Sequence, residues 1–180
     1  MRIIFRRAVL FLAVFAALQA LWAAGRGTWI ERVWIEDLTV RSATLIINAL
    51  SPAAHAEAKG SRIAAAGGGL NILQGCEGVE VVFMLAAAFV AFPMRARLRL
   101  YGLASGLVFV FALNQLRILA LFYAFRNDRQ LFDLLHTTVA PLVLIVLTGL
   151  FFHFWAARAQ RAGAPTLANA RQQTASVHSQ

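Results

Sequence analysis

The sequence predicts an all-α integral membrane protein, built as a bundle of about four transmembrane helices with an amphipathic interfacial helix on the outer side. Of the 180 residues, 60% are hydrophobic and only 14% are charged, and the mean hydropathy is +0.67. A water-soluble domain of this length exposes too much surface to be so apolar, so lipid must be a large part of its solvent. Long apolar runs with basic residues at their ends indicate the same class.

Residues 1–25 are predicted to form an N-terminal transmembrane anchor. Three arginines precede an uncharged run over residues 8–25, which is long enough for a slightly short transmembrane helix. The same stretch also has the layout of a signal peptide, with a basic start, an apolar middle and small residues near positions 20–24. Gln19 and Trp22 make a poor cleavage site, which favours a retained helix.

Residues 26–71 are expected on the outer side of the membrane, as an amphipathic helix and a glycine-rich loop. Over residues 29–50, apolar residues recur at intervals of three and four, but five charged residues exclude a span. With two tryptophans, this helix should lie along the interface or pack on the bundle. Residues 51–69 are small and polar and predict a mobile loop, and residues 70–73 predict a short extended segment.

Residues 72–157 are predicted to be a three-helix core. Pro93 and the arginines after it end the first of these helices, and Pro141 lies in the first turns of the last, where a missing N–H costs little. Charged residues before the last helix predict a solvated connecting turn. Residues 158–180 are polar without helical periodicity, which predicts a disordered cytoplasmic tail. The three core helices are expected at residues 79–93, 100–125 and 137–157.

The basic residues predict the orientation of the chain in the membrane. One side carries only arginines, namely Arg2, Arg6, Arg7, Arg95, Arg97, Arg99, Arg158, Arg161 and Arg171. The other side carries the remaining eight basic residues and all eight acidic residues, so its charge is 8 − 8 = 0. Because an excess of Lys and Arg marks the cytoplasmic side, both termini should lie in the cytoplasm of a bacterial inner membrane. The net charge of +9 is then a topology signal, and no nucleic-acid partner is expected beside the lipid bilayer.

Three reactive side chains are predicted to reach one depth of the membrane. At 1.5 Å per helical residue, Cys76, Arg117 and His136 lie about 30, 27 and 33 Å above the inner rows of arginines. A hydrocarbon core is about 30 Å thick, so all three lie near its outer boundary. With only four helices, a thiol, a guanidinium and an imidazole at one level should be near one another.

This set of side chains fits nucleophilic catalysis. Cys76 is the only cysteine, so it forms no intramolecular disulfide, and a helix N-terminus and a nearby cation would both favour its thiolate. His136 could take the thiol proton and later protonate a leaving amine. Arg117 could hold the oxyanion of a tetrahedral intermediate, or a carboxylate or carbonyl of a substrate. No metal or cofactor is expected.

Each of these three residues also has a structural explanation. A single cysteine in a membrane helix is commonly a small apolar packing residue. A histidine at a helix start can simply sit in the headgroup region. Arg117 can snorkel to the nearby interface, although an ionisable group inside a span is costly and is by default functional.

Four further residues are expected to support the site. Asn114, one turn before the arginine, could orient its guanidinium or bond the backbone. Glu80, one turn after the cysteine, could pair with the same guanidinium, whereas Glu77 is expected to face water. Gly75 and Gly78 would let a substrate backbone approach the sulfur closely.

At these residues the sequence resembles the exosortase/archaeosortase family of membrane cysteine transpeptidases. The matching residues are Gly75-Cys76-Glu77-Gly78 at the start of one helix, Asn114-Gln115-Leu116-Arg117-Ile118 in the next, and His136 at the start of the last. The resemblance covers roughly residues 67–155, and the chain looks like a short, single-core member. The family often has Asn or Ser where this chain has Glu77.

The resemblance implies Cys76 as the nucleophile, His136 as the acid/base and Arg117 as the electrostatic partner. It implies a substrate class too: exported proteins with a C-terminal sorting tail made of a short motif, a transmembrane helix and a basic end. Cleavage would occur at the periplasmic face through an acyl-enzyme, which water or a surface amine or hydroxyl then resolves. The alternatives are a non-enzymatic multi-pass scaffold or assembly subunit, and a small transporter, which would need polar groups at mid-depth on several helices.

Overall fold

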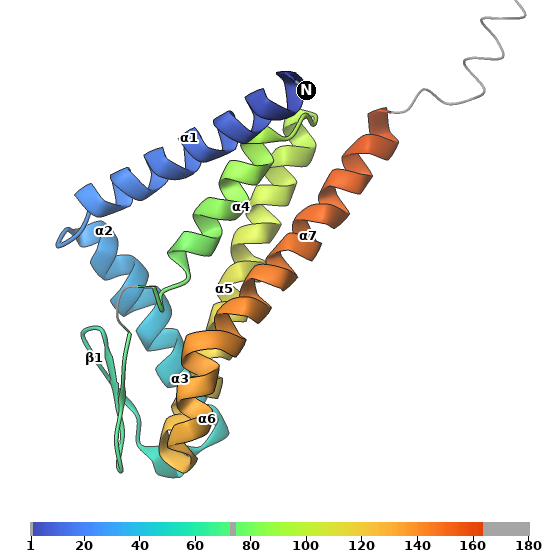
Figure 1. The fold of residues 1–180 in the computed structure, drawn as a ribbon. Helices are drawn as coiled ribbons and strands as arrows, with labels where there is room; N and C mark the ends of the chain where they lie inside the picture. Colours follow the sequence, from blue (N-terminus) through green and yellow to red (C-terminus); the bar gives the residue numbers. More distant parts are fainter. Residues whose placement is uncertain (1, 73–74, 164–180) are drawn as a thin grey trace, which may run out of the picture.

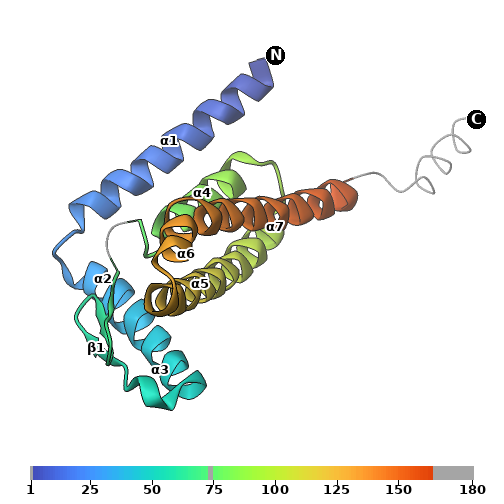
Figure 2. The same cartoon turned by 60° about the horizontal axis from the view of Figure 1, so that its bottom comes forward.

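The computed structural model describes residues 2–72 and 75–163, and it confirms an all-α membrane protein (Figure 1). Within these residues, three helices are long and apolar enough to cross a membrane, namely Arg2–Ala24, Ala96–Asn127 and Arg129–Arg161. The N-terminal helix α1 (Arg2–Ala24) has no buried residue, and it lies beside α4 while it diverges from α7 (Figures 1 and 2). An apolar helix with no buried side needs lipid around it.

The second predicted span, expected at residues 79–93, is a shorter helix, α4 (Val79–Ala91). Its 13 residues cover about 20 Å, less than the roughly 30 Å thickness of a hydrocarbon core. The helix stops early because Phe92 is already extended and Pro93 follows it, and a proline disfavours the helical conformation of the residue before it.

Small residues let α4 pack closely on α5 (Ala96–Asn127). A Cβ added at Gly102 would clash with the Phe89 ring, and one added at Gly106 would meet Leu85 at 2.6 Å. Glycine at such positions lets helix backbones approach in a membrane, where lipid tails are as apolar as the side chains. The two helices and α7 form the apolar centre of the bundle.

The last helical segment begins earlier than predicted. It consists of α6 (Arg129–Leu134), the π-helical segment η3 (Leu135–Val139) and α7 (Ala140–Gly163). The prediction of a solvated connecting turn is therefore wrong for most of its length, because these residues are helical. Asp128 caps the helix by accepting hydrogen bonds from the N–H groups of Gln130 and Leu131 at 2.9 and 3.1 Å. Helix α7 also extends to Gly163, beyond the expected end at residue 157, and residues 164–180 of the predicted tail lie outside the described residues.

The amphipathic helix has the predicted bounds, and it packs on the bundle. It runs as α2 (Trp29–Arg32), the π-helical segment η1 (Val33–Val40) and α3 (Arg41–Leu50). Its buried side faces α5, and its other apolar residues, such as Ile30 and Leu38, remain exposed. The fully buried residues of that side include Val40, Ala43 and Ile47.

The prediction of a mobile loop at residues 51–69 is wrong, because part of this segment folds into a small antiparallel sheet. A short 3₁₀ turn, η2 (Pro52–Ala54), precedes β1 (Glu57–Lys59), β2 (Arg62–Ala64) and β3 (Leu70–Asn71), in the order β1-β2-β3. Ile63 opposes Leu70, and both side chains are buried in the cluster that includes Ile118 and Phe122 of α5. This contact with α5 supplies an apolar face without which so small a sheet would be marginal.

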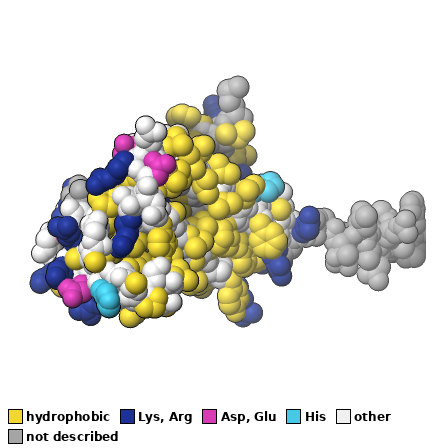
Figure 3. Space-filling model, turned by 90° about the horizontal axis from the view of Figure 1, so that it is seen from below, with side chains coloured by type: hydrophobic (Ala, Val, Ile, Leu, Met, Phe, Trp, Pro, Cys, Tyr) yellow, Lys and Arg dark blue, Asp and Glu magenta, His cyan; other side chains and the backbone are white. Residues whose placement is uncertain are grey.

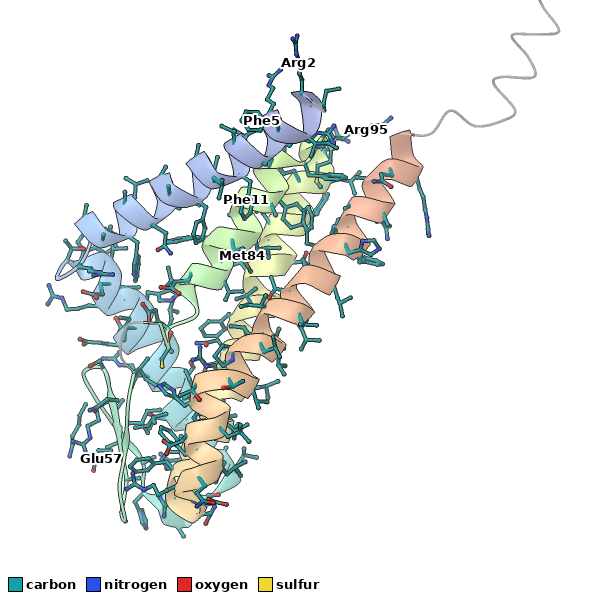
Figure 4. The ribbon with its side chains drawn as sticks, viewed as in Figure 1. Arg2, Phe5, Phe11, Glu57, Met84 and Arg95 are labelled. Atoms are coloured by element: carbon teal, nitrogen blue, oxygen red, sulfur yellow. The ribbon has the colours of Figure 1, made fainter. Side chains whose placement is uncertain are left out.

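Charged residues lie at opposite ends of the molecule. Arg2 and Arg95 lie at one end and Glu57 at the other (Figure 4). Seen from the end that carries the sheet, acidic and basic side chains gather together on one part of the surface, beside a broad hydrophobic area (Figure 3). This separation agrees with the division of charges along the sequence.

Candidate active site

Two left-handed glycines shape the segment that carries the cysteine. Gly75 has φ +85° and Gly78, the residue before α4, has φ +74°, a region that side-chain-bearing residues rarely adopt. A Cβ on Gly78 would also lie 2.9 Å from the Asn114 side chain, whereas one on Gly75 would meet nothing within 4 Å. Gly78 is therefore required by backbone conformation and by close packing, and Gly75 leaves open space beside the thiol.

Asn114 fixes the backbone of the cysteine. Its Nδ2 donates to the Cys76 carbonyl oxygen at 3.2 Å, and the side chain is only 2% exposed. Of the two roles expected for Asn114, the structure thus gives it the backbone bond. Its Oδ1 has no hydrogen-bond partner among the described residues.

Arg117 reaches the same segment from one turn further along α5. Its Nη1 donates to the Gly75 carbonyl oxygen at 3.1 Å, and its Nη2 lies 3.9 Å from Cys76 Sγ. The expected ion pair with Glu80 is wrong, because the described residues form only two salt bridges, Arg41–Asp37 and Lys59–Glu57. The guanidinium is engaged by backbone and sulfur, and Glu80 is exposed.

His136 approaches the thiol from the third element. Its Nδ1 lies 3.9 Å from Cys76 Sγ, and its ring stacks on Phe132, with centroids 5.4 Å apart and planes 5° from parallel. The residue lies in the π-helical segment η3, and such wide turns often occur at functional sites. The structure therefore brings the thiol, the imidazole and the guanidinium together, as their common depth predicted.

Glu77 is buried, which corrects the expectation that it faces water. It is 5% exposed, and its Oε2 has no partner among the described residues. Burial raises the pKa of Glu77, the backbone N–H groups of residues 75–77 oppose this rise, and the nearby Glu80 charge adds to it.

The protein environment favours the protonated form of the Cys76 thiol more than water does for a free cysteine. Cys76 lies before α4, outside the apolar helices, and is 8% exposed. Burial raises the pKa of Cys76, Arg117 opposes the rise, and Glu77 adds to it. The expectation that a helix terminus and a cation leave the thiolate favoured is therefore reversed by desolvation, and any nucleophilic chemistry at this sulfur requires a base.

A cavity of about 420 Å³ opens beside the thiol and the imidazole. Apart from Cys76 and His136, its walls come from the β3 segment and from apolar side chains of α5 and α6, which are Gly69, Leu70, Asn71, Ile72, Ile118, Leu121, Phe125 and Phe132. A cavity of this size and polarity suits an organic or peptide ligand. Among the described residues, no group of three or more His, Cys, Asp or Glu could hold a metal ion.

Two residues of the site were missed by the sequence analysis. Trp34 Nε1 donates to the Glu77 carbonyl oxygen at 3.2 Å, and Phe132 supports the imidazole. Trp34 had been interpreted as an interfacial residue, and no sequence signal links it to a peptide 43 positions away. Phe132 lies four residues before His136, so its contact could have been found once the helix was known to begin at Arg129.

Comparison with known proteins gives one match. The family model described as transmembrane exosortase matches residues 2–155, which is most of the chain and extends beyond the resemblance at residues 67–155 into the N-terminal helices. No curated protein and no solved structure matches the chain.

Proposed function

The chain belongs to the transmembrane exosortase family, and we propose that it is a membrane-embedded cysteine peptidase/transpeptidase. Its substrates are exported proteins that end in a sorting signal made of a short motif, a transmembrane helix and a basic end. It cleaves this signal through a thioester between Cys76 and the substrate.

The observation that carries the proposal is the convergence of two polar side chains on one sulfur. His136 Nδ1 and Arg117 Nη2 each lie 3.9 Å from Cys76 Sγ, and the two residues are 60 and 41 positions away from the cysteine in the sequence, respectively. A cavity with apolar walls adjoins the thiol and the imidazole. A cysteine that only fills space needs neither a base nor a cation at its sulfur. A nucleophilic thiol whose pKa is raised needs a base to remove its proton, and a nearby cation stabilises the thiolate.

Acylation uses His136 first as a base and then as an acid. Nδ1 takes the thiol proton while Sγ attacks the scissile carbonyl carbon, which requires the tautomer with its proton on Nε2. A C–S bond forms, and the carbonyl oxygen becomes an oxyanion that the Arg117 guanidinium stabilises. The C–N bond then breaks, His136 returns the proton to the leaving amine, and a thioester on Cys76 remains.

Deacylation uses His136 in the same order, first as a base and then as an acid. Water, or an amine or hydroxyl of a surface molecule, attacks the thioester carbonyl while His136 accepts its proton. The tetrahedral intermediate collapses, the C–S bond breaks, and the proton returns to the sulfur. Water as acceptor gives hydrolysis, and another acceptor gives transfer.

The site faces the periplasm in this proposal. The arginine-only side of the chain, which includes Arg2 and Arg95, lies in the cytoplasm of the inner membrane (Figure 4). Cys76 lies at the opposite end of α4 from Arg95, so a substrate reaches the thiol after its main part has crossed the membrane.

The proposal is tested by co-expressing a tail-bearing substrate with single-residue variants. Cys76→Ser, Arg117→Ala and His136→Ala should each leave the substrate uncleaved while the enzyme inserts normally. His153→Ala, which changes an exposed histidine of α7 away from the thiol, is the matched control and should cleave like the unaltered protein. Full processing by Cys76→Ser would overturn the proposal.

A further inference from the structure

The strand β3 lies at the edge of the small sheet, and no strand among the described residues pairs with its outer side. The order β1-β2-β3 places β2 in the centre. Beside β3, the Ile72 N–H donates to the Ser61 carbonyl oxygen at 2.8 Å, and Leu70, two residues earlier, opposes Ile63 of β2. Because backbone groups of alternate residues point in opposite directions along an antiparallel strand, Asn71 directs its N–H and C=O groups away from β2.

This unpaired edge borders the cavity beside the thiol. Gly69, Leu70, Asn71 and Ile72 all line the cavity that also contains Cys76 and His136. Leu70 and Ile72 are buried, whereas Asn71 is exposed. The residues of the strand edge and the nucleophile thus line the same cavity.

An unpaired strand edge is a ready template for another extended chain. The edge supplies main-chain donors and acceptors in a fixed spacing, and pockets beside it select alternate side chains. Here the buried face of the sheet points to α5, so alternate residues of an added strand would enter a space walled by Ile118, Leu121, Phe125 and Phe132. These walls carry no charge.

We propose that the extended segment of the substrate next to the scissile bond adds to β3 as a fourth strand. The N–H and C=O groups of Asn71 bond the substrate backbone, and apolar side chains at alternate positions of the substrate fill the cavity. The inference rests on the proposed function, because it names how that site holds its polypeptide substrate. Strand addition fixes the register of the peptide and thereby presents one carbonyl carbon to Cys76 Sγ.

Replacing Asn71 by proline removes the outward donor and leaves the sheet paired. Proline lacks an N–H and is tolerated at edge strands where that N–H is unpaired. The matched control is Ala58→Pro on the opposite edge strand β1, since Ala58 opposes Ile63, whose backbone groups bond β3. Both changes place a proline at an outward-facing edge position of the same three-stranded sheet, but only Asn71 lines the cavity.

The test measures how fast two reagents alkylate Cys76, the only cysteine. One is a peptidyl chloromethyl ketone with apolar residues at alternate positions, and the other is iodoacetamide, which needs no strand. The ratio of their rate constants should fall about tenfold in Asn71→Pro and stay within twofold of the unaltered value in Ala58→Pro. With the unaltered enzyme, a peptidyl reagent whose backbone nitrogens are methylated should lose a similar factor.

Two results would overturn the proposal: an unchanged ratio in Asn71→Pro, or full reactivity of the methylated reagent. The methylated reagent keeps the inference testable if Asn71→Pro does not fold. Failure of the proposed function is a separate result, because it appears as substrate cleavage by Cys76→Ser, whatever the alkylation ratios are.

Discussion

At the residue scale, Cys76 combines a weakly acidic thiol with the two groups that can activate it. Burial raises the pKa of the thiol, so little thiolate is present at neutral pH. In the proposed mechanism, His136 removes the thiol proton and Arg117 stabilises the oxyanion, and both groups lie 3.9 Å from the sulfur.

The charges beside the thiol predict opposite shifts in its titration. Glu77 adds to the rise in the pKa of Cys76, so Glu77→Gln should lower this pKa and speed alkylation by iodoacetamide at neutral pH. Arg117 opposes the rise, so Arg117→Ala should raise the pKa further and slow alkylation. The measurement is the pH profile of the alkylation rate, followed by intact mass.

The control for this titration is Glu57→Gln, which removes an exposed carboxylate on β1. Its profile should match that of the unaltered protein. Shifts of the same sign in Glu77→Gln and Arg117→Ala would contradict the electrostatic account of the thiol.

The Trp34 hydrogen bond predicts a distant positioning effect. Trp34→Phe removes the donor to the Glu77 carbonyl oxygen but keeps an aromatic ring, which can still meet Phe111 edge to face. This hydrogen bond holds the backbone of Glu77, the residue after Cys76. Its loss should lower kcat for substrate cleavage about tenfold, with little effect on KM. Trp29→Phe, at a tryptophan that is 68% exposed, is the matched control, and equal effects of the two variants would argue against the positioning role.

At the element scale, Gly78 joins the reactive segment to α4 and to α5. Gly78→Ala should lower the free energy of unfolding by about 1–3 kcal/mol, because φ is +74° and the new Cβ would meet Asn114 at 2.9 Å. Gly149→Ala is the matched control, since its Cβ would meet nothing within 4 Å in α7 and alanine favours a helix. Thermal unfolding in detergent measures both, and equal melting temperatures would contradict the packing described here.

The helices could be predicted from the sequence because each is long and apolar. Residues 29–50 were predicted with their observed bounds, and the common depth of Cys76, Arg117 and His136 followed from helix lengths alone. The start of α4 and its end at Pro93 were predicted to within two residues. The early start at Arg129 was not predicted, because the Asp128 cap decides it locally.

The extended segment at residues 70–73 was predicted, and β3 lies within it, but its pairing in a sheet and the burial of Glu77 could not be predicted. Strands of two or three residues show no periodicity, and β2 and β3 depend on burying Ile63 and Leu70 against a helix far along the chain. Such features come from tertiary contacts, which no local pattern encodes.

At the scale of the whole molecule, the separation of charges predicts which end faces the periplasm. In a Cys76→Ser background, Ala58→Cys on β1 should react with a membrane-impermeant maleimide added to intact spheroplasts. Arg161→Cys, at an exposed position of α7, should react only after the membrane is permeabilised. The opposite labelling pattern would contradict the proposed orientation.

The central claim is that Cys76 forms a covalent thioester with the substrate. The most direct measurement is the intact mass of the enzyme after mixing with a tail-bearing substrate and quenching in acid. The account predicts a mass increase equal to the part of the substrate before the cleaved bond, located on Cys76, removed by hydroxylamine and absent from Cys76→Ser. Cleavage of the substrate without any such adduct, at an equal rate in Cys76→Ser, would contradict it.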